Sequence, residues 1–386
     1  MAKVRTGQLI LAAVLAIFIY GVIAALLGTL MPTLKTQLSL TDEQLGNIGL
    51  AQAIGLVIAS LSAGPLIDNK GKKVGLVGGL GLIALALFLL PNSTSYETVM
   101  AYMFLLGFGG GILVTAANAL AGDVNEERRG STLNFLNLFF GLGGLATPFI
   151  SANLMGGDVI RFCFVAAILT AGVFLLHIFT PMPPPSGERG FKLSEASQVL
   201  SRPVLWLLAL FLFLYVAAEV GVWNWLARYL TARGIDEKTA LNILGFGFAL
   251  GLLIGRVVVS RILIKISAPT VTLASALLMA VTTYLMLQSS DTTIAWIAVF
   301  CAGLAMAPVF PTTLAMVGDA FPVATATAMG IVITFGWIGL AISSRIIGSL
   351  ANSSGLGTAL LILPAFSVIM VIVNLALRPM LRARRA

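Results

Sequence analysis

Residues 213–225 read FLYVAAEVGVWNW, and they place one acidic residue inside an otherwise apolar segment. The apolar run extends over 204–226, and its ionisable side chains are Tyr215 and Glu219. At helical spacing Tyr215, Glu219 and Trp223 stand at i, i+4 and i+8, so they share one side of a helix. A carboxylate in hydrocarbon costs several kcal/mol and is retained only with a partner, a proton or a watery cavity. The fold therefore depends on whether this run crosses a membrane.

The overall composition is that of a membrane protein with many spans. Of the 386 residues, 59% are hydrophobic and 10% are charged, and the mean hydropathy is +1.02. Soluble proteins carry about 25% charged residues. The net charge of +8 could suggest a nucleic-acid partner, but the basic residues are spread through short loops. Membrane topology explains that distribution better, so we expect a lipid bilayer as partner and no nucleic acid.

The sequence offers little for metal, cofactor or catalytic chemistry. Cys163 and Cys301 lie in apolar runs without metal-ligand spacing, which predicts core packing rather than a disulfide or metal site. His177, the one histidine, lies near the end of an apolar run, which favours an interfacial role. The glycine-rich GFGGG at 107–111 lies within a membrane run, so it predicts helix packing and not nucleotide binding. We expect no cofactor, no metal and no enzymatic activity.

Twelve apolar runs are long enough, at about 20 residues each, to cross a bilayer as helices. They lack the short alternating pattern of a membrane β-barrel. The first run is too long for a signal peptide and is expected to remain as a span. The predicted fold is an all-α membrane protein with spans near 9–33, 45–67, 74–92, 98–121, 130–154, 160–179, 204–229, 241–264, 270–288, 293–317, 324–349 and 357–377.

The distribution of basic residues predicts the orientation. Twelve spans put both termini on one side, and the loops on that side together with the tails carry 17 of the 23 Lys and Arg residues. Arg345 lies within the eleventh run and is expected to snorkel outward, although a role in a cavity is open. The positive-inside rule then predicts a bacterial-type inner membrane with both termini cytoplasmic. The opposite loops carry five basic residues, namely Lys35, Arg161, Arg228, Arg233 and Lys238.

The two halves of the chain repeat each other. FIY at 18–20 matches FLY at 213–215, and FGxxGL at 140–145 matches the same pattern at 335–340, both at an offset of 195. Gly-Asp at 122–123 matches Gly-Asp at 318–319 at an offset of 196. We therefore expect pseudo-symmetric six-helix bundles over 1–180 and 204–386, joined by a cytoplasmic linker over 181–203. Such duplicated transporters bind substrate between the halves, near the bilayer midplane.

The most specific motif is GPLIDNKGKK at 64–73, in the tight inner loop between the second and third spans. An ordinary basic inner loop would explain its lysines alone. The whole motif resembles the G-x-L-x-D-x-x-G-x-[RK]-[RK] signature of the major facilitator superfamily, where this loop is a conformational latch for alternating access. The resemblance implies a gating role for Gly64, Asp68, Gly71 and Lys73.

Shorter stretches resemble the fucose permease branch of that superfamily. They are TAAN at 115–118, LNFLNLFFG at 133–141, YVAAE at 215–219 with Trp-Leu at 225–226, and PVFPT at 308–312. The branch contains proton-coupled and some sodium-coupled sugar symporters. Its functional acids in the first and fourth spans are replaced here by Gly28 and Val114. Of the 15 acids, only Glu219 lies deep in a span, so we expect it to carry the coupling proton.

Polar and aromatic side chains in the apolar runs form the predicted substrate site. Asn134 and Asn137 share one face of the fifth run, and amides suit sugar hydroxyls while aromatic faces stack on sugar rings. Inter-helix hydrogen bonding explains any single asparagine equally well, but the cluster favours a site. The predicted substrate-binding residues are Tyr20, Gln52, Asn118, Asn134, Asn137, Tyr215, Trp223, Asn224, Phe310, Thr312 and Trp337.

Three local features complete the expectations. Gly221 is expected to break or unwind the seventh helix and so turn Asn224 and Trp225 inward, since both lie off the helix face that carries Glu219. The prolines at 308 and 311 are expected to kink the tenth helix. Arg256, near the inner end of the eighth run, is expected to pair with Asp319 across the inner gate.

Together these patterns predict a monomeric secondary transporter that moves a neutral sugar or related polyol by proton-coupled symport. A proton-coupled exporter of drugs or lipophiles is one alternative, and an uncoupled or sodium-coupled sugar transporter is another. An intramembrane enzyme is disfavoured because the spans contain one histidine and no acid pair.

Overall fold

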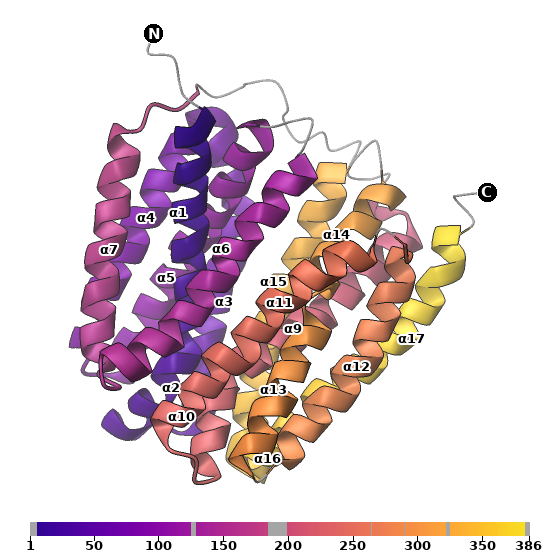
Figure 1. Ribbon diagram of the computed structural model, residues 1–386. Helices are drawn as coiled ribbons and strands as arrows, with labels where there is room; N and C mark the ends of the chain where they lie inside the picture. The colour runs from indigo at the N-terminus through magenta and orange to yellow at the C-terminus, as the bar shows by residue number, and fades with distance from the viewer. Residues whose placement is uncertain are drawn as a thin grey trace.

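The structure is a computed structural model that describes residues 6–124, 129–183, 199–263, 265–289, 291–321 and 325–382. Within this part of the chain, twelve helical spans are long and apolar enough to cross a membrane. The spans form two groups, one from each half of the chain (Figure 1). The first turn of α1 and the last turn of α17 lie at the same end of the molecule. Large apolar side chains, among them Ile168, Phe179 and Ile372, are exposed on the outer surface as lipid contact requires.

The first half contains six spans, some of which are interrupted. Its elements are α1 (Thr6–Ala24), α2 (Leu26–Gln37), α3 (Asp42–Lys70), α4 (Lys72–Leu89), η1 (Leu90–Asn92), α5 (Tyr96–Val124), α6 (Arg129–Phe149), η3 (Ile150–Leu154) and α7 (Val159–Phe179). α1 and α2 together make one span, Thr6–Gln37, which ends later than the sequence predicted.

The second half also contains six spans. Its elements are α9 (Pro203–Ala232), α10 (Glu237–Asn242), η4 (Ile243–Ala249), α11 (Leu250–Ile262), α12 (Ala268–Gln288), α13 (Thr292–Met306), α14 (Val309–Ala320), α15 (Thr325–Ser354), α16 (Leu356–Leu360) and α17 (Ile362–Arg382). The predicted fold of two six-helix bundles is confirmed. The linker expected at 181–203 falls largely outside the described residues, so the domain boundaries remain predictions.

Two predictions about helix breaks have opposite outcomes. The tenth span is interrupted between Met306 and Val309, in agreement with the kink expected from Pro308. The break expected at Gly221 is wrong, because α9 is one continuous helix. A Cβ on Gly221 would lie 2.4 Å from Leu363 Cδ2, so this glycine admits the neighbouring helix instead of unwinding its own.

The internal repeat appears as the same packing contact in both halves. A Cβ on Gly143 of α6 would lie 2.3 Å from the carbonyl oxygen of Phe18 in α1. A Cβ on Gly339 of α15 would lie 2.3 Å from the carbonyl oxygen of Phe213 in α9. In each half a glycine therefore lets the fifth helix of the bundle touch the backbone of the first. These two contacts hold α1, which carries Tyr20, against α6, and α9, which carries Glu219, against α15.

Candidate functional site: a charged and aromatic cluster between the two halves

Glu219 occupies the middle of α9, 16 residues after its first residue, Pro203, and 13 before its last, Ala232. Its side chain is 9% exposed, so it is nearly enclosed by protein. Tyr215 and Trp223 lie one turn away on either side along α9, as predicted, and the Tyr215 hydroxyl is buried without a hydrogen-bond partner among the described residues. Glu219 interacts electrostatically with Arg256 of α11 and Tyr20 of α1. The deep acid thus faces residues from both halves of the molecule.

Aromatic rings of the first half cover this cluster. The ring of Tyr20 lies 5.5 Å from the ring of Phe140 on α6, measured between centroids. Gly144, one turn further along α6, leaves room for the Trp223 indole, since a Cβ there would lie 3.0 Å from its Cη2. Trp223 in turn meets Phe248 edge to face at 5.1 Å. The arrangement provides flat apolar walls around one carboxyl group.

Arg256 brings a positive charge to the same place and links the two halves. Its Nη1 donates a hydrogen bond to the backbone oxygen of Asn137 on α6, at 3.0 Å. Its guanidinium carbon lies 5.7 Å from the centre of the Phe140 ring, a distance at which the aromatic face attracts a cation. α6 and the span formed by α10, η4 and α11 run side by side (Figure 1). The predicted pairing of Arg256 with Asp319 remains a prediction.

A second set of polar contacts joins the halves at the end away from the termini. Asp42 at the start of α3 is contacted by Lys35 of the same half and by Arg228 of α9, at 3.4 Å. Arg345 of α15 forms an ion pair with Glu43 at 2.8 Å. Arg345 was expected to snorkel outward, and its partly exposed guanidinium reaches Glu43 of the other half at this end of the molecule.

Uncharged groups extend these contacts. Arg345 also donates to Asn47 Oδ1 at 2.7 Å, and Thr33 donates to Glu237 at 3.3 Å. The amides of Asn153 and Asn242 exchange hydrogen bonds, one of them at 3.3 Å. Sequence reasoning missed this network because its partners lie up to 298 residues apart. The sequence did contain a signal: Arg345 lies alone within one span, and the acids Asp42 and Glu43 begin another span.

Three other predicted substrate-binding residues are buried within the protein. Gln52 is buried and donates to Ile23 O at 3.4 Å, inside the first half. Asn224 is buried against α2, where a Cβ on Gly28 would lie 3.1 Å from its Cα. Thr312 is fully buried, and its hydroxyl has no partner among the described residues.

The five remaining candidates lie on α5, α6, α14 and α15. Asn118 on α5 is exposed, while Phe310 on α14 and Trp337 on α15 are partly buried. Asn137 is partly buried and contributes its backbone oxygen to Arg256. The side chain of Asn134 lies outside the described residues. Among the predicted set, the structure thus gathers Tyr20, Tyr215, Trp223 and Glu219 into one cluster.

The predicted latch is described in part. Gly71 separates α3 from α4 with a φ of +88°, a backbone conformation that favours glycine. Lys73 donates to Ile178 O at 2.6 Å, near the end of α7. This contact holds the loop against a helix C-terminus, where the carbonyl groups attract a cation. The surroundings of Gly64 and the side chain of Asp68 are not among the described parts of the structure, and the gating role of all four residues remains a prediction.

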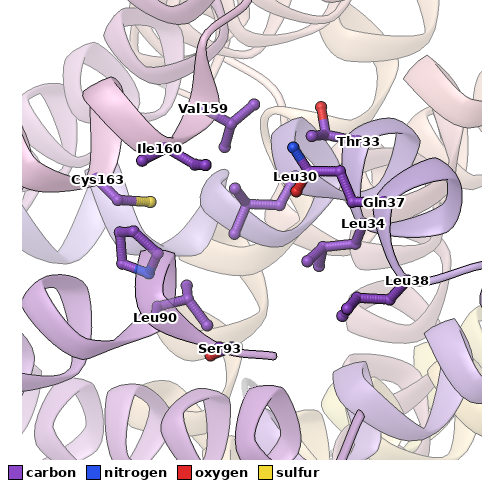
Figure 2. Close-up of a pocket in the computed structure, with 11 residues that line it drawn as sticks. Leu30, Thr33, Leu34, Gln37, Leu38, Leu90, Ser93, Val159, Ile160 and Cys163 are labelled. Carbon is purple, nitrogen blue, oxygen red and sulfur yellow. The ribbon is translucent and has the colours of Figure 1, made fainter. Parts of the chain in front are cut away.

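A separate pocket lies within the first half, between α2, η1 and α7 (Figure 2). Leu30, Leu34 and Val159 make its apolar wall, and Thr33 and Gln37 add polar atoms. It contains none of the predicted substrate-binding residues. The pocket is therefore distinct from the cluster between the halves.

Comparison with known proteins places the chain in a family. The family model described as Major Facilitator Superfamily matches residues 13–262 and 234–385. A glucose/galactose transporter of Brucella abortus is 26% identical over 367 residues, covering 90% of this chain and 88% of that protein. The 4-hydroxybenzoate transporter PcaK of Pseudomonas aeruginosa is 32% identical over 150 residues, which cover 38% of this chain and 33% of that protein.

Solved structures share the fold across nearly the whole chain. A mutant of the nucleoside transporter NupG superposes with a TM-score of 0.82 at 14% identity, covering 96% of this chain and 99% of that one. A mutant of the E. coli fucose:proton symporter FucP superposes with a TM-score of 0.67 at 20% identity, covering 95% and 98%. The family model, the twelve spans and the paired bundles agree. The chain therefore belongs to the major facilitator superfamily and is a transporter, not an enzyme.

Proposed function

We propose that this protein is a secondary active transporter of a sugar or a related hydroxyl-rich molecule, working as a proton-coupled symporter. The observation that carries the proposal is the cluster of Tyr20, Tyr215, Trp223 and Glu219 where the halves meet. A carboxyl group enclosed by aromatic rings suits both proton binding and contact with a sugar ring. The printed descriptions of relatives as glucose/galactose, nucleoside and fucose:proton transporters support hydroxyl-rich cargo. The description of PcaK as a 4-hydroxybenzoate transporter leaves the charge of the cargo open.

The proposed transport cycle depends on the protonation and deprotonation of Glu219. Glu219 takes up a proton from one side, and the site with its cargo then becomes exposed to the other side. Release of the cargo and the proton there restores the carboxylate and its attraction to Arg256. Because the two groups lie between the bundles, each step alters the contact between α9, α11 and α6. Alternating access by rocking of the bundles is the motion expected for this architecture.

The conformation supports a cycle with an outer gate. If the termini are cytoplasmic, as the basic loops predict, Asp42, Glu43, Arg228 and Arg345 mark the outer end. Their contacts across the halves then hold the outer side closed. The glycines of α3 and α15 strengthen this closure, since a Cβ on Gly46 would lie 2.5 Å from Ser344 O. The inner latch at Lys73 would act at the opposite end.

Uptake into proteoliposomes tests the proposed function. Labelled sugars and polyols are offered to the purified full-length protein under an imposed proton gradient, an imposed sodium gradient, or no gradient. Accumulation driven by the proton gradient supports the proposal. Accumulation with sodium alone, or equilibration without any gradient, would replace proton symport by the other sugar mechanisms. Expulsion of hydrophobic cations without uptake of any hydroxyl-rich molecule would favour the exporter.

A further inference from the structure

Arg256 contacts α6 and also acts electrostatically on Glu219, so its positive charge contributes to the net charge of the cluster. One of its nitrogens, Nη1, is bonded to Asn137 O, and its guanidinium lies over the Phe140 ring. Its Nε is buried and finds no hydrogen-bond partner among the described residues. A buried guanidinium donor without a partner is costly, and it is available to an acceptor that enters the site.

The titratable and charged neighbours of Glu219 among the described residues come from three helices. They are Tyr20 on α1, Tyr215 on α9 and Arg256 on α11. Tyrosine hydroxyls are uncharged near neutral pH. When Glu219 is ionised, its charge and that of Arg256 therefore cancel. The ionised Glu219 and Arg256 thus contribute one negative and one positive charge to the cluster.

Proton binding upsets this balance. A protonated Glu219 no longer balances the positive charge of the guanidinium, which is partly buried within the span Glu237–Val259. An unpaired charge in such surroundings is strongly unfavourable. An uncharged sugar brings hydroxyl groups but no compensating charge. A molecule with one carboxylate restores neutrality at the moment when the proton binds, and the planar guanidinium matches a carboxylate with two parallel hydrogen bonds.

We propose that the preferred cargo is a monocarboxylate of the sugar-acid class, such as a hexuronate, whose carboxylate is held by Arg256. This proposal rests on the proposed function, in particular on Glu219 as the proton carrier. The aromatic rings of Tyr20, Phe140 and Trp223 would contact the sugar ring. One proton and one monoanion cross together, so the transport step moves no net charge. The proposal replaces the neutral sugar expected from the sequence with an acidic sugar.

Matched pairs of substrates test the proposal on the full-length protein. Glucose is compared with glucuronate, and galactose with galacturonate, as competitors in a counterflow assay without a proton gradient. Because a charge-assisted pair adds binding energy over a neutral hydroxyl, the uronate should compete roughly tenfold better than its parent hexose. Its uptake under a proton gradient should not respond to a membrane potential imposed with potassium and valinomycin.

A variant series assigns the effect to one residue. Arg256→Gln should remove the preference for the uronate, and Arg256→Lys should restore it in part because the charge is kept without the planar fork. Arg261→Gln is the matched control, since this exposed arginine lies in the last turn of the same helix. Size-exclusion profiles verify that each variant is folded. Retention of the uronate preference by folded Arg256→Gln would overturn the assignment.

The outcomes separate this inference from the function on which it rests. Proton-driven uptake of hexoses with no competition by uronates would disprove the acidic cargo and leave proton–sugar symport standing. Absence of uptake for every sugar and uronate under every gradient would disprove the proposed function itself. Uronate uptake that responds to membrane potential would contradict the one-proton, one-anion balance.

Discussion

Arg345 of α15 forms a 2.8 Å ion pair with Glu43 of α3, and so joins the eleventh span to the second across the two halves. Both side chains are partly exposed, at 42% and 39%. An ion pair of this kind contributes little to folding stability. It exists only while the two helix ends are close, however, so it biases the balance between two arrangements of the bundles.

We predict that Arg345→Gln weakens closure at this end. Loss of an exposed pair worth up to about 1 kcal/mol changes the ratio of closed to open molecules by up to about fivefold. Spin labels at Gln37 and Asn352, with Cys163 and Cys301 replaced by alanine, report the separation of the two ends. The variant should show a larger fraction of long distances.

Arg233→Gln serves as the control for this prediction. Arg233 lies near the same end, and its contacts are with Tyr229 of its own helix. Its substitution should leave the distance distribution unchanged. Equal distributions for Arg345→Gln and the parent would show that the pair has no part in closure.

Because α2 and α9 approach closely, we predict that a methyl group added at Gly28 destabilises the protein. A Cβ on Gly28 would lie 1.8 Å from the Trp223 carbonyl oxygen, so Gly28→Ala must push the helices apart. Overpacking of this kind costs about 1–3 kcal/mol. The melting temperature of the purified protein in detergent should fall, with loss of transport.

Gly172→Ala is the matched substitution in an open position. Nothing lies within 4 Å of a Cβ at Gly172, and alanine favours a helix over glycine. Its melting temperature should equal or exceed that of the parent. A Gly28→Ala protein as stable and active as Gly172→Ala would show that α2 and α9 are not packed this closely.

The contact between Lys73 and Ile178 predicts an effect on the rate of transport. Lys73→Gln removes a charge from the end of α7 without touching the cluster between the halves. The maximal rate should fall while the substrate concentration at half-maximal rate changes less than about twofold, as expected for a gating group. Lys70→Gln, at an exposed position of the same loop, is the control. A shift in half-saturation alone would contradict a gating role.

The sequence sufficed for the fold because each span carries its own signal. Apolar length, basic loops and the repeat between 18–20 and 213–215 are local patterns that need no knowledge of tertiary contacts. The stripe of Tyr215, Glu219 and Trp223 was predictable for the same reason. The continuity of α9 at Gly221 was not, because that glycine is explained by Leu363 from a distant helix.

The charge partners were the least predictable part of the site. Helical spacing determines which residues share a face, but not which helix approaches that face. Arg256 was assigned to an inner gate from its position along the eighth run, yet its contacts with Asn137 and Phe140 depend on the crossing of α6 and α11. Arg345 likewise gained its partner from the packing of α15 on α3.

The central claim is that Glu219 carries the coupling proton, and one comparison tests it most directly. Glu219→Gln and the parent protein are assayed in proteoliposomes for exchange of labelled substrate without a gradient and for accumulation under a proton gradient. Glu97→Gln, at an exposed acid near one end of α5, is the control and should retain both activities. The account predicts that Glu219→Gln exchanges substrate but no longer accumulates it. Undiminished proton-driven accumulation by Glu219→Gln would contradict the account.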